Sequence, residues 1–362
     1  MAAFVWWLGE PPGARALEVG VIPLVTDDQA AHAAAIADPA LVNPWGVSHS
    51  ATSPFWVSDN GTGQATLYSV DPTTGTPAKG ALAVSIPGDG PVTGQAFNGA
   101  SGTGTFNFDP FLFVSEDGTV SGWRGALGTA AETLVLGSSG NVYKGTTLGS
   151  SNGSSYLYSA NFRAGTIDVL KGSAGAPDLP GNFTDPNLPS GYAPFNVQNL
   201  GGALYVTYAV QDASKKDEVA GAGNGIVDVF DLQGSLQRRL VTGGELNAPW
   251  GLALAPSSFG ALAGDLLVGN FGDGRIHVYD PATGALVDTL TGSAGQPLSI
   301  DGLWALMAGN GGNGGSSESI YFTAGPDGES HGLFGALAPV PEPGSLALLV
   351  LGLVGLLGVR RR

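Results

Sequence analysis

The feature of this sequence that most restricts its fold is a unit of about 50 residues that recurs along the chain. One copy reads LVNPWGVSHSATSPFWVSDNGTGQATLYSVDPTTG at 41–75, and another reads LNAPWGLALAPSSFGALAGDLLVGNFGDGRIHVYDPATG at 246–284. Both contain Pro-Trp-Gly near the start and end on Asp-Pro-x-Thr-Gly. Short apolar runs separated by Gly, Pro, Asn and Asp predict the strands of a β-meander in each copy.

Six such units can be counted from their opening residues, which are spaced by 49 to 55 residues. The openings begin at Pro44, Gly94, Gly145, Pro194, Pro249 and Asp301. A second and a third apolar run follow each opening. Six four-stranded units at this period predict an all-β fold, a six-bladed β-propeller over residues 18–339. The alternative is a β-sandwich with accidental internal similarity.

The last unit reaches Pro339 directly after its third strand, so the sixth blade is one strand short. We expect residues 18–26 (EVGVIPLVT) to supply the outer strand and to leave no open sheet edge. The Ala-rich stretch 28–37 is expected to be a short helix or a loop. The charged insertion 212–218 and the Gly-rich stretch 309–315 are expected to be solvent loops.

Composition excludes several classes of function. The formal charge is −16, and three of the fourteen basic residues are the last three of the chain. An acidic body repels phosphate backbones, which argues against a nucleic-acid partner. The chain has no cysteine, which removes disulfides, thiolate metal sites and Cys nucleophiles.

The two ends carry targeting signals. Residues 1–17 include an apolar stretch that fits a secretory signal, although the positively charged beginning of such a signal is missing, which suggests a truncated start. At the other end, residues 340–362 form a tail in which Pro341, Glu342 and Pro343 precede the uncharged run 346–359 and the basic end Arg360, Arg361 and Arg362. As a helix, fourteen residues span about 21 Å, short of a bilayer core of about 30 Å.

This tail closely resembles the PEP-CTERM sorting signal. The resemblance implies a Gram-negative exporter whose exosortase recognises the tail, removes it and delivers the body to the outer envelope or the extracellular matrix. Before processing, the short hydrophobic helix would anchor the chain in the inner membrane, with the arginines on the cytoplasmic side. A plain, uncleaved C-terminal membrane anchor is the alternative.

The body resembles a family of uncharacterised exported propeller proteins that often carry this tail. The likeness is carried by residues 38–46 (DPALVNPWG) and 55–61 (FWVSDNG) and runs from about Val21 to Pro339. It implies a propeller fold and export but no established activity. The blades are more distantly similar to NHL-type repeats, whose members include binding modules and enzymes.

In a propeller, the loops that enter the inner strands and the turns between second and third strands emerge on one face. The ligand-binding candidates on this face are Asn43, Trp45, Asn60, Asp117, Asn161, Asn247, Trp250, Asn270 and Trp304. Trp and Asn side chains suit a sugar, through ring stacking and hydroxyl hydrogen bonds. Of these, Asn60, Asp117, Asn161 and Asn270 are expected at equivalent turn positions in four blades.

The same turns supply candidate oxygen ligands for Ca²⁺, which takes six to eight hard oxygens. The candidate metal ligands are Asp59, Asn60, Glu116, Asp117, Asn161 and Asn270. Tight hairpins select Asn, Asp and Gly for reasons of backbone geometry alone, so a purely structural role is the competing interpretation.

The sequence therefore predicts an exported binding or interaction module of the envelope or matrix, with an exopolysaccharide or an envelope protein as partner. The first alternative is a Ca²⁺-dependent propeller hydrolase or lactonase. The second is a purely structural matrix protein, which needs no pocket. No catalytic residue is indicated.

Overall fold

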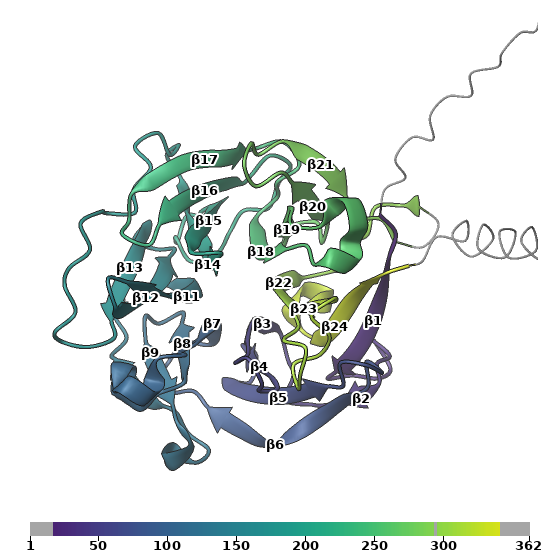
Figure 1. Cartoon of the computed structure of the whole chain (residues 1–362), viewed down its shortest axis with the longest axis horizontal. Helices are drawn as coiled ribbons and strands as arrows, with labels where there is room; N and C mark the ends of the chain where they lie inside the picture. The colour runs from purple at the N-terminus through teal and green to yellow at the C-terminus, as the bar shows by residue number, and fades with distance from the viewer. Residues whose placement is uncertain (1–16, 293–294, 341–362) are drawn as a thin grey trace, which may run out of the picture.

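The computed structural model describes residues 17–292 and 295–340, which form six β-sheets arranged around one axis (Figure 1). This confirms the six-bladed propeller expected from the repeats. The expected signal segment up to residue 16, the sorting-motif residues Pro341, Glu342, Pro343, Arg360, Arg361 and Arg362, and the C-terminal hydrophobic helix lie outside the described residues.

Each blade is a meander that runs outward from the axis. Blade 1 contains β3 (Pro44–Ser48), β4 (Phe55–Asp59), β5 (Gln64–Val70) and β6 (Pro77–Ser85). Blade 2 contains β7 (Val92–Phe97), β8 (Phe111–Ser115), β9 (Val120–Trp123) and β10 (Glu132–Val135). Blade 3 contains β11 (Tyr143–Ser151), β12 (Ser154–Asn161) and β13 (Thr166–Lys171).

The second half follows the same order. Blade 4 contains β14 (Tyr192–Leu200), β15 (Ala203–Val210), β16 (Ile226–Asp231) and β17 (Leu236–Thr242). Blade 5 contains β18 (Pro249–Leu254), β19 (Leu266–Asn270), β20 (Ile276–Tyr279) and β21 (Leu286–Thr289). Blade 6 contains β22 (Leu303–Ala308), β23 (Ile320–Ala324), β24 (Leu333–Pro339), β1 (Val19–Thr26) and β2 (Ile36–Ala37).

Within the part of the chain that the structure describes, the helical elements are all short. They are the 3₁₀ turns η1 (Ser101–Thr103), η2 (Thr105–Phe108), η3 (Gly125–Leu127) and η4 (Ser257–Leu262), and the helix α1 (Pro326–Glu329). No helix in the described ranges is long and apolar enough to cross a membrane.

Blade 3 departs from the expected four strands, because no fourth strand joins β13. The chain between β13 and β14, residues 172–191, holds four prolines, each of which lacks the N–H that a ladder needs. The count of four strands in every unit was therefore wrong for this blade.

Closure of the ring follows the expected route. β1 pairs antiparallel with β24, from Val19 opposite Pro339 to Thr26 opposite Leu333. The N-terminal strand thus joins the first described segment of the chain to its last blade (Figure 1). The Ala-rich stretch 28–37 forms a loop rather than a helix, and its end, β2, pairs parallel with β1.

Every inner strand carries a register irregularity close to its first residue. In β3 it lies between Pro44 and Val47. A register shift occurs at the corresponding place in β7, β11, β14, β18 and β22. A β-bulge bends its strand and re-aims the side chain inside it. The six bulges therefore set which side chains reach the axis.

Glycine allows these strands to approach one another. A Cβ at Gly46 would lie 2.6 Å from the backbone oxygen of Thr93, and one at Gly94 would lie 2.7 Å from the backbone nitrogen of Thr146. Such contacts with backbone atoms cannot be relieved by a side-chain rotation. Glycine at this position of the Pro-Trp-Gly motif is thus a packing requirement of the narrow axis.

Candidate functional site

We call the upper face the side of the propeller at which the inner strands begin. The residue inside each bulge of an inner strand occupies an equivalent place there, and the six together form what we call the axial ring. Its members are Trp45, Thr93, Lys144, Phe195, Trp250 and Trp304. All six are buried, with exposed fractions between 0 and 4%.

The three tryptophans pack on one another and fill the upper end of the channel. The ring centroids of Trp45 and Trp304 are 3.7 Å apart and stacked, and Trp250 meets both edge-on. Phe271 stacks on Trp304 at 4.0 Å. Because these indoles are buried against each other, they do not present the exposed stacking surface for a sugar that the sequence suggested.

Lys144 is the charged member of the axial ring, and no side-chain surface of it is exposed. Its Nζ donates to Glu116 Oε1 at 2.6 Å and lies 3.4 Å from Asp217 Oδ1. The same Nζ lies 4.8 Å from the centroid of Trp45, within cation–π range. A buried ammonium is tolerated here because carboxylates and an aromatic face surround it.

The insertion 212–218, which we call the cross-channel loop, supplies part of this surrounding. Lys216 Nζ lies 3.1 Å from Glu116 Oε2, so Glu116 is bound from blade 3 by Lys144 and from blade 4 by the loop. Most of the loop is exposed, as expected, but Lys216 and Asp217 also contact Glu116 and Lys144 at the axis. The Gly-rich loop 309–315 is likewise bound to blade 1, where Asn310 Nδ2 donates to the carbonyls of Ser50 and Ser53.

Two further carboxyl groups near Lys144 have perturbed acidities. Burial raises the pKa of Glu218 to about 7, against the opposing attraction of Lys144. Burial also raises the pKa of Glu329, whose Oε2 accepts a hydrogen bond from Asn43 Nδ2 at 2.7 Å. The upper end of the axis thus combines one buried cation with acids that titrate closer to neutrality than usual.

The amide side chains expected on the upper face are engaged with the backbone and with each other. Asn43 Oδ1 accepts from Trp304 Nε1 at 3.1 Å, and Asn43 Nδ2 donates to Asn60 Oδ1 at 3.2 Å. Asn247 Oδ1 accepts from the backbone of Gly221 at 2.7 Å. These bonds join neighbouring loops of the upper face.

Strand pairing corrects the expected equivalence of the four turn residues. Asn161 and Asn270 do occupy equivalent positions in their blades. Asn161 pairs with Tyr143, the first residue of β11, and Asn270 pairs with Pro249, the first residue of β18. The corresponding residue is Asp59 in blade 1 and Ser115 in blade 2. Asn60 therefore lies one residue beyond this position, and Asp117 lies two residues beyond it.

Asn161 and Asn270 each clamp a turn to the entry strand of their blade. Asn161 Oδ1 accepts from the Val142 backbone at 3.2 Å, and Asn270 Oδ1 accepts from the Asn247 backbone at 3.1 Å. Their amide nitrogens donate to Asp168 and Asp273, respectively. This is the backbone role that tight turns give to Asn.

The six candidate metal ligands do not share one centre. Among residues 17–292 and 295–340, no group of three or more His, Asp or Glu side chains is placed to hold an ion. Asp59 is buried inside blade 1, and burial raises its pKa well above the usual range, which favours a neutral carboxyl rather than a Ca²⁺ ligand. Glu116 is occupied by two lysines.

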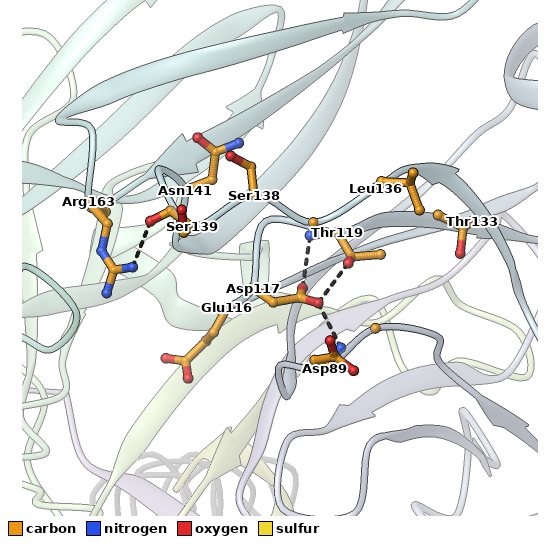
Figure 2. Close-up of a pocket in the computed structure, with 12 residues that line it drawn as sticks. Asp89, Glu116, Asp117, Thr119, Thr133, Leu136, Ser138, Ser139, Asn141 and Arg163 are labelled. Carbon is orange, nitrogen blue, oxygen red and sulfur yellow. Dashed lines mark hydrogen bonds between the residues drawn. The ribbon is translucent and has the colours of Figure 1, made fainter.

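Asp117 lies in a pocket of about 610 Å³ between blades 2 and 3, open at the upper face (Figure 2). We call it the upper pocket. Its polar lining residues are Asp89, Glu116, Asp117, Thr119, Thr133, Ser138, Ser139, Asn141 and Arg163. Leu136, 81% exposed, stands at its edge. The pocket thus presents hydroxyl, amide, carboxylate and guanidinium groups in one hollow.

The floor of the upper pocket is fixed by hydrogen bonds to Asp117. Its carboxylate accepts from the Thr119 backbone at 2.9 Å, from the Thr119 hydroxyl at 2.8 Å and from the Asp89 backbone at 2.7 Å (Figure 2). These bonds hold the pKa of Asp117 below its ordinary value, against the opposing effect of burial. Arg163 Nη1 donates to the Ser139 carbonyl on the opposite wall.

Sequence reasoning missed Lys144, Arg163, Glu218 and the cross-channel loop as parts of this face. The signal for Lys144 lay in the alignment of the repeats: with Pro-Trp-Gly matched to Tyr-Lys-Gly at 143–145, Lys144 occupies the position at which three of the other five copies have Trp. The repeats carry no comparable signal for Glu218, because the insertion that contains it occurs in one blade.

Two findings come from comparison with known proteins. The PEP-CTERM protein-sorting motif matches residues 339–362, which implies export, sorting to the cell surface and processing by an exosortase. The chain is also 32% identical over 331 residues to the uncharacterized protein R648 of Acanthamoeba polyphaga mimivirus, covering 86% of this chain and 77% of that protein. Mimivirus protein L690 is 32% identical over 320 residues, 84% of this chain and 82% of L690.

Among solved structures, the α-L-arabinanase of Penicillium chrysogenum, crystallised with arabinobiose, aligns with a TM-score of 0.51 over 91% of this chain and 99% of that one. At 11% identity this likeness concerns the fold alone.

Proposed function

Because the chain belongs to the family of the mimivirus proteins R648 and L690 and ends in a PEP-CTERM motif, we propose that it is an exported binding module. It acts in the outer envelope or the extracellular matrix of a Gram-negative bacterium, where the upper pocket holds an exopolysaccharide. Before processing, the hydrophobic tail anchors it in the inner membrane.

The observation that carries this proposal is the chemistry of the upper pocket. A polysaccharide presents many hydroxyl groups, each of which donates and accepts hydrogen bonds. Ser138, Ser139 and Asn141 offer both functions, while Asp89 and Arg163 offer charged acceptors and donors. A volume of about 610 Å³ lies within the range of small-molecule sites and admits part of a chain.

Pre-organisation supports the same proposal. The three hydrogen bonds to Asp117 fix the position of the 117–119 turn before any ligand arrives, so little ordering cost remains at binding. The Asp89 carboxylate is exposed and lines the pocket, so its oxygens are available to accept hydrogen bonds from a ligand. Binding through a rigid, polar hollow requires no catalytic group.

The test uses exopolysaccharide purified from the producing bacterium and the propeller immobilised on a sensor surface. We expect wild-type protein to retain the polysaccharide, and Asp89→Asn and Arg163→Gln to weaken retention several-fold. Asp178→Asn is the matched control, because it also removes one exposed carboxylate, which pairs with Lys171 and does not line the upper pocket. Equal retention by all four proteins, or no retention by the wild type, would contradict the proposal.

Processing is tested separately by intact mass. Protein recovered from the cell surface should lack 346–362, because the exosortase cleaves near the Pro-Glu-Pro triplet. A surface form that still ends on Arg362 would instead establish the plain membrane anchor.

A further inference from the structure

The channel below the axial ring contains a second hollow that the proposed function does not use. Its upper part, about 20 Å³, is lined by residues from all six inner strands. Its lower part, about 150 Å³, is lined by residues of five of those strands, β3, β7, β11, β14 and β22, and by His49. We call the two parts together the lower funnel.

The two parts are continuous, because both are lined by the same five residues. These are Val47, Gln95, Thr146, Gln198 and Met307. The packed tryptophans of the axial ring close the funnel from above. Its mouth lies where the inner strands end, at Ser48, Phe97 and Asn199, and therefore on the face opposite the upper pocket.

The lining of the lower funnel is free of Asp, Glu, Lys and Arg among the described residues. This is unexpected in a chain with a formal charge of −16. The one titratable side chain at the mouth, His49, has both ring nitrogens within 3.0 Å of the carbonyl oxygens of Ser50 and Ala308. An ionised ligand would meet no Asp, Glu, Lys or Arg side chain of the described lining, and those residues would not compensate the hydration that it loses.

The polar groups of the funnel are neutral amides and hydroxyls. Gln95, Thr146 and Asn199 are bonded within the protein, which fixes the wall. Gln198 makes no side-chain hydrogen bond to any described residue and lines both parts of the funnel. Its amide supplies a donor and an acceptor to whatever enters.

A second polar group in the upper part lacks a partner. The indole Nε1 of Trp250, a residue 4% exposed that lines this part, has no hydrogen-bond partner within the described chain. A buried N–H donor without an acceptor destabilises the folded protein. The upper part, which Trp250 helps to line, has room for one water or one hydroxyl group.

The remaining wall is apolar. Val47, Phe97, Leu148 and Met307 line the wide part of the funnel. A ligand that matches this wall has carbon-bound hydrogens on one side and hydroxyl groups on the other. Sugars have this division, and the absence of charged groups in the lining selects neutral ones.

We propose that the lower funnel binds a single neutral sugar unit, either a free monosaccharide or the uncharged end of a glycan. The volume of about 150 Å³ is below the roughly 300 Å³ at which sites for larger ligands begin, so one ring enters rather than a chain segment. Gln198 makes the orienting hydrogen bonds, and Met307 and Phe97 contact the face of the ring.

The experiment titrates the folded propeller with glucose, galactose, arabinose and N-acetylglucosamine, and with glucuronic acid as the charged comparator. Tryptophan fluorescence and calorimetry follow binding to about 100 mM, which saturates a millimolar site. We expect saturable binding of at least one neutral sugar and none of glucuronic acid. Gln198→Leu should weaken binding about tenfold or more, because it removes both orienting bonds.

Gln198→Glu is the second variant, since it keeps the size and introduces a charge, and it should also weaken the binding of the neutral sugar. Asp89→Asn, in the upper pocket, should leave this binding unchanged, which separates the two sites. Absence of saturation by every neutral sugar would show that the funnel holds water only and would overturn the proposal. Equal binding by the Gln198 variants, or tighter binding of glucuronic acid, would overturn it as well.

Discussion

Lys144→Met is the substitution for which the structure gives the sharpest expectation. Methionine keeps most of the length and apolar surface of the lysine stem, so the packing against Trp45 changes little. The change removes the ammonium that donates to Glu116 and lies beside Asp217. It thereby isolates the electrostatic role of Lys144 in the axial ring.

The expected cost follows from burial. Both partners are almost fully removed from solvent, with side-chain exposures of 0% for Lys144 and 7% for Glu116. Removing one partner of a buried pair costs about 3–5 kcal/mol, because the other charge stays buried. Lys216 still contacts Glu116 from a half-exposed position, which places the estimate at about 3 kcal/mol. For a domain of this size that is a fall in melting temperature of about 4–5 °C.

The assay is a double-mutant cycle in differential scanning calorimetry at one pH and one ionic strength. Glu116→Gln alone leaves the ammonium of Lys144 with the exposed Asp217 as its remaining carboxylate, and should also destabilise the protein. The double variant should lose less than the sum of the two, because neither charge is then left without its partner. A melting temperature of Lys144→Met within about 1 °C of wild type, or additive effects in the cycle, would refute the argument.

Three further predictions concern the fold around this site. A chain that starts at Asp27 lacks β1 and leaves β24 without its outer partner, so it should melt well below the full propeller; an unchanged melting curve would contradict the closure seen in the structure. Gly46→Ala should cost about 1–3 kcal/mol because its Cβ would meet the Thr93 backbone at 2.6 Å, whereas Gly125→Ala, with open space around it, should be near neutral. Burial and the neighbouring Asp185 raise the pKa of Asp228 to about 7, so the folded state holds a proton that the unfolded chain has lost between about pH 4 and 7. Stability from this group is therefore full at acidic pH and falls as pH rises through 7, and Asp228→Asn should flatten that part of the stability profile measured by urea unfolding.

The architecture could be predicted from the sequence because each blade is encoded by a copy of the same repeated unit. Unit openings recur every 49 to 55 residues, and the missing strand of the last unit identifies β1 as its replacement. The blade count, the meander order and the closing strand all follow from that regularity. Blade 3 escaped the prediction because its prolines interrupt a ladder without changing the spacing of the units.

The site was predicted less well because it lies where the repeats differ. Asn161 and Asn270 were expected as ligands, yet residues shared by several blades serve the turn that those blades share. Lys144 and the cross-channel loop occur once each, and a single residue or insertion has no second copy from which its place can be inferred. Their meeting depends on contacts among blades 2, 3 and 4, which a strand-by-strand reading does not contain.

The axial ring explains why the two faces of this propeller differ in chemistry. Its tryptophans close the channel, so groups above and below them are separated by a layer of buried aromatic rings. Above the layer, Lys144 compensates the carboxylates that gather around the axis. Below it, the described lining holds no Asp, Glu, Lys or Arg side chain. The upper face is therefore suited to charged and highly polar ligands, and the lower funnel is suited to a small neutral one.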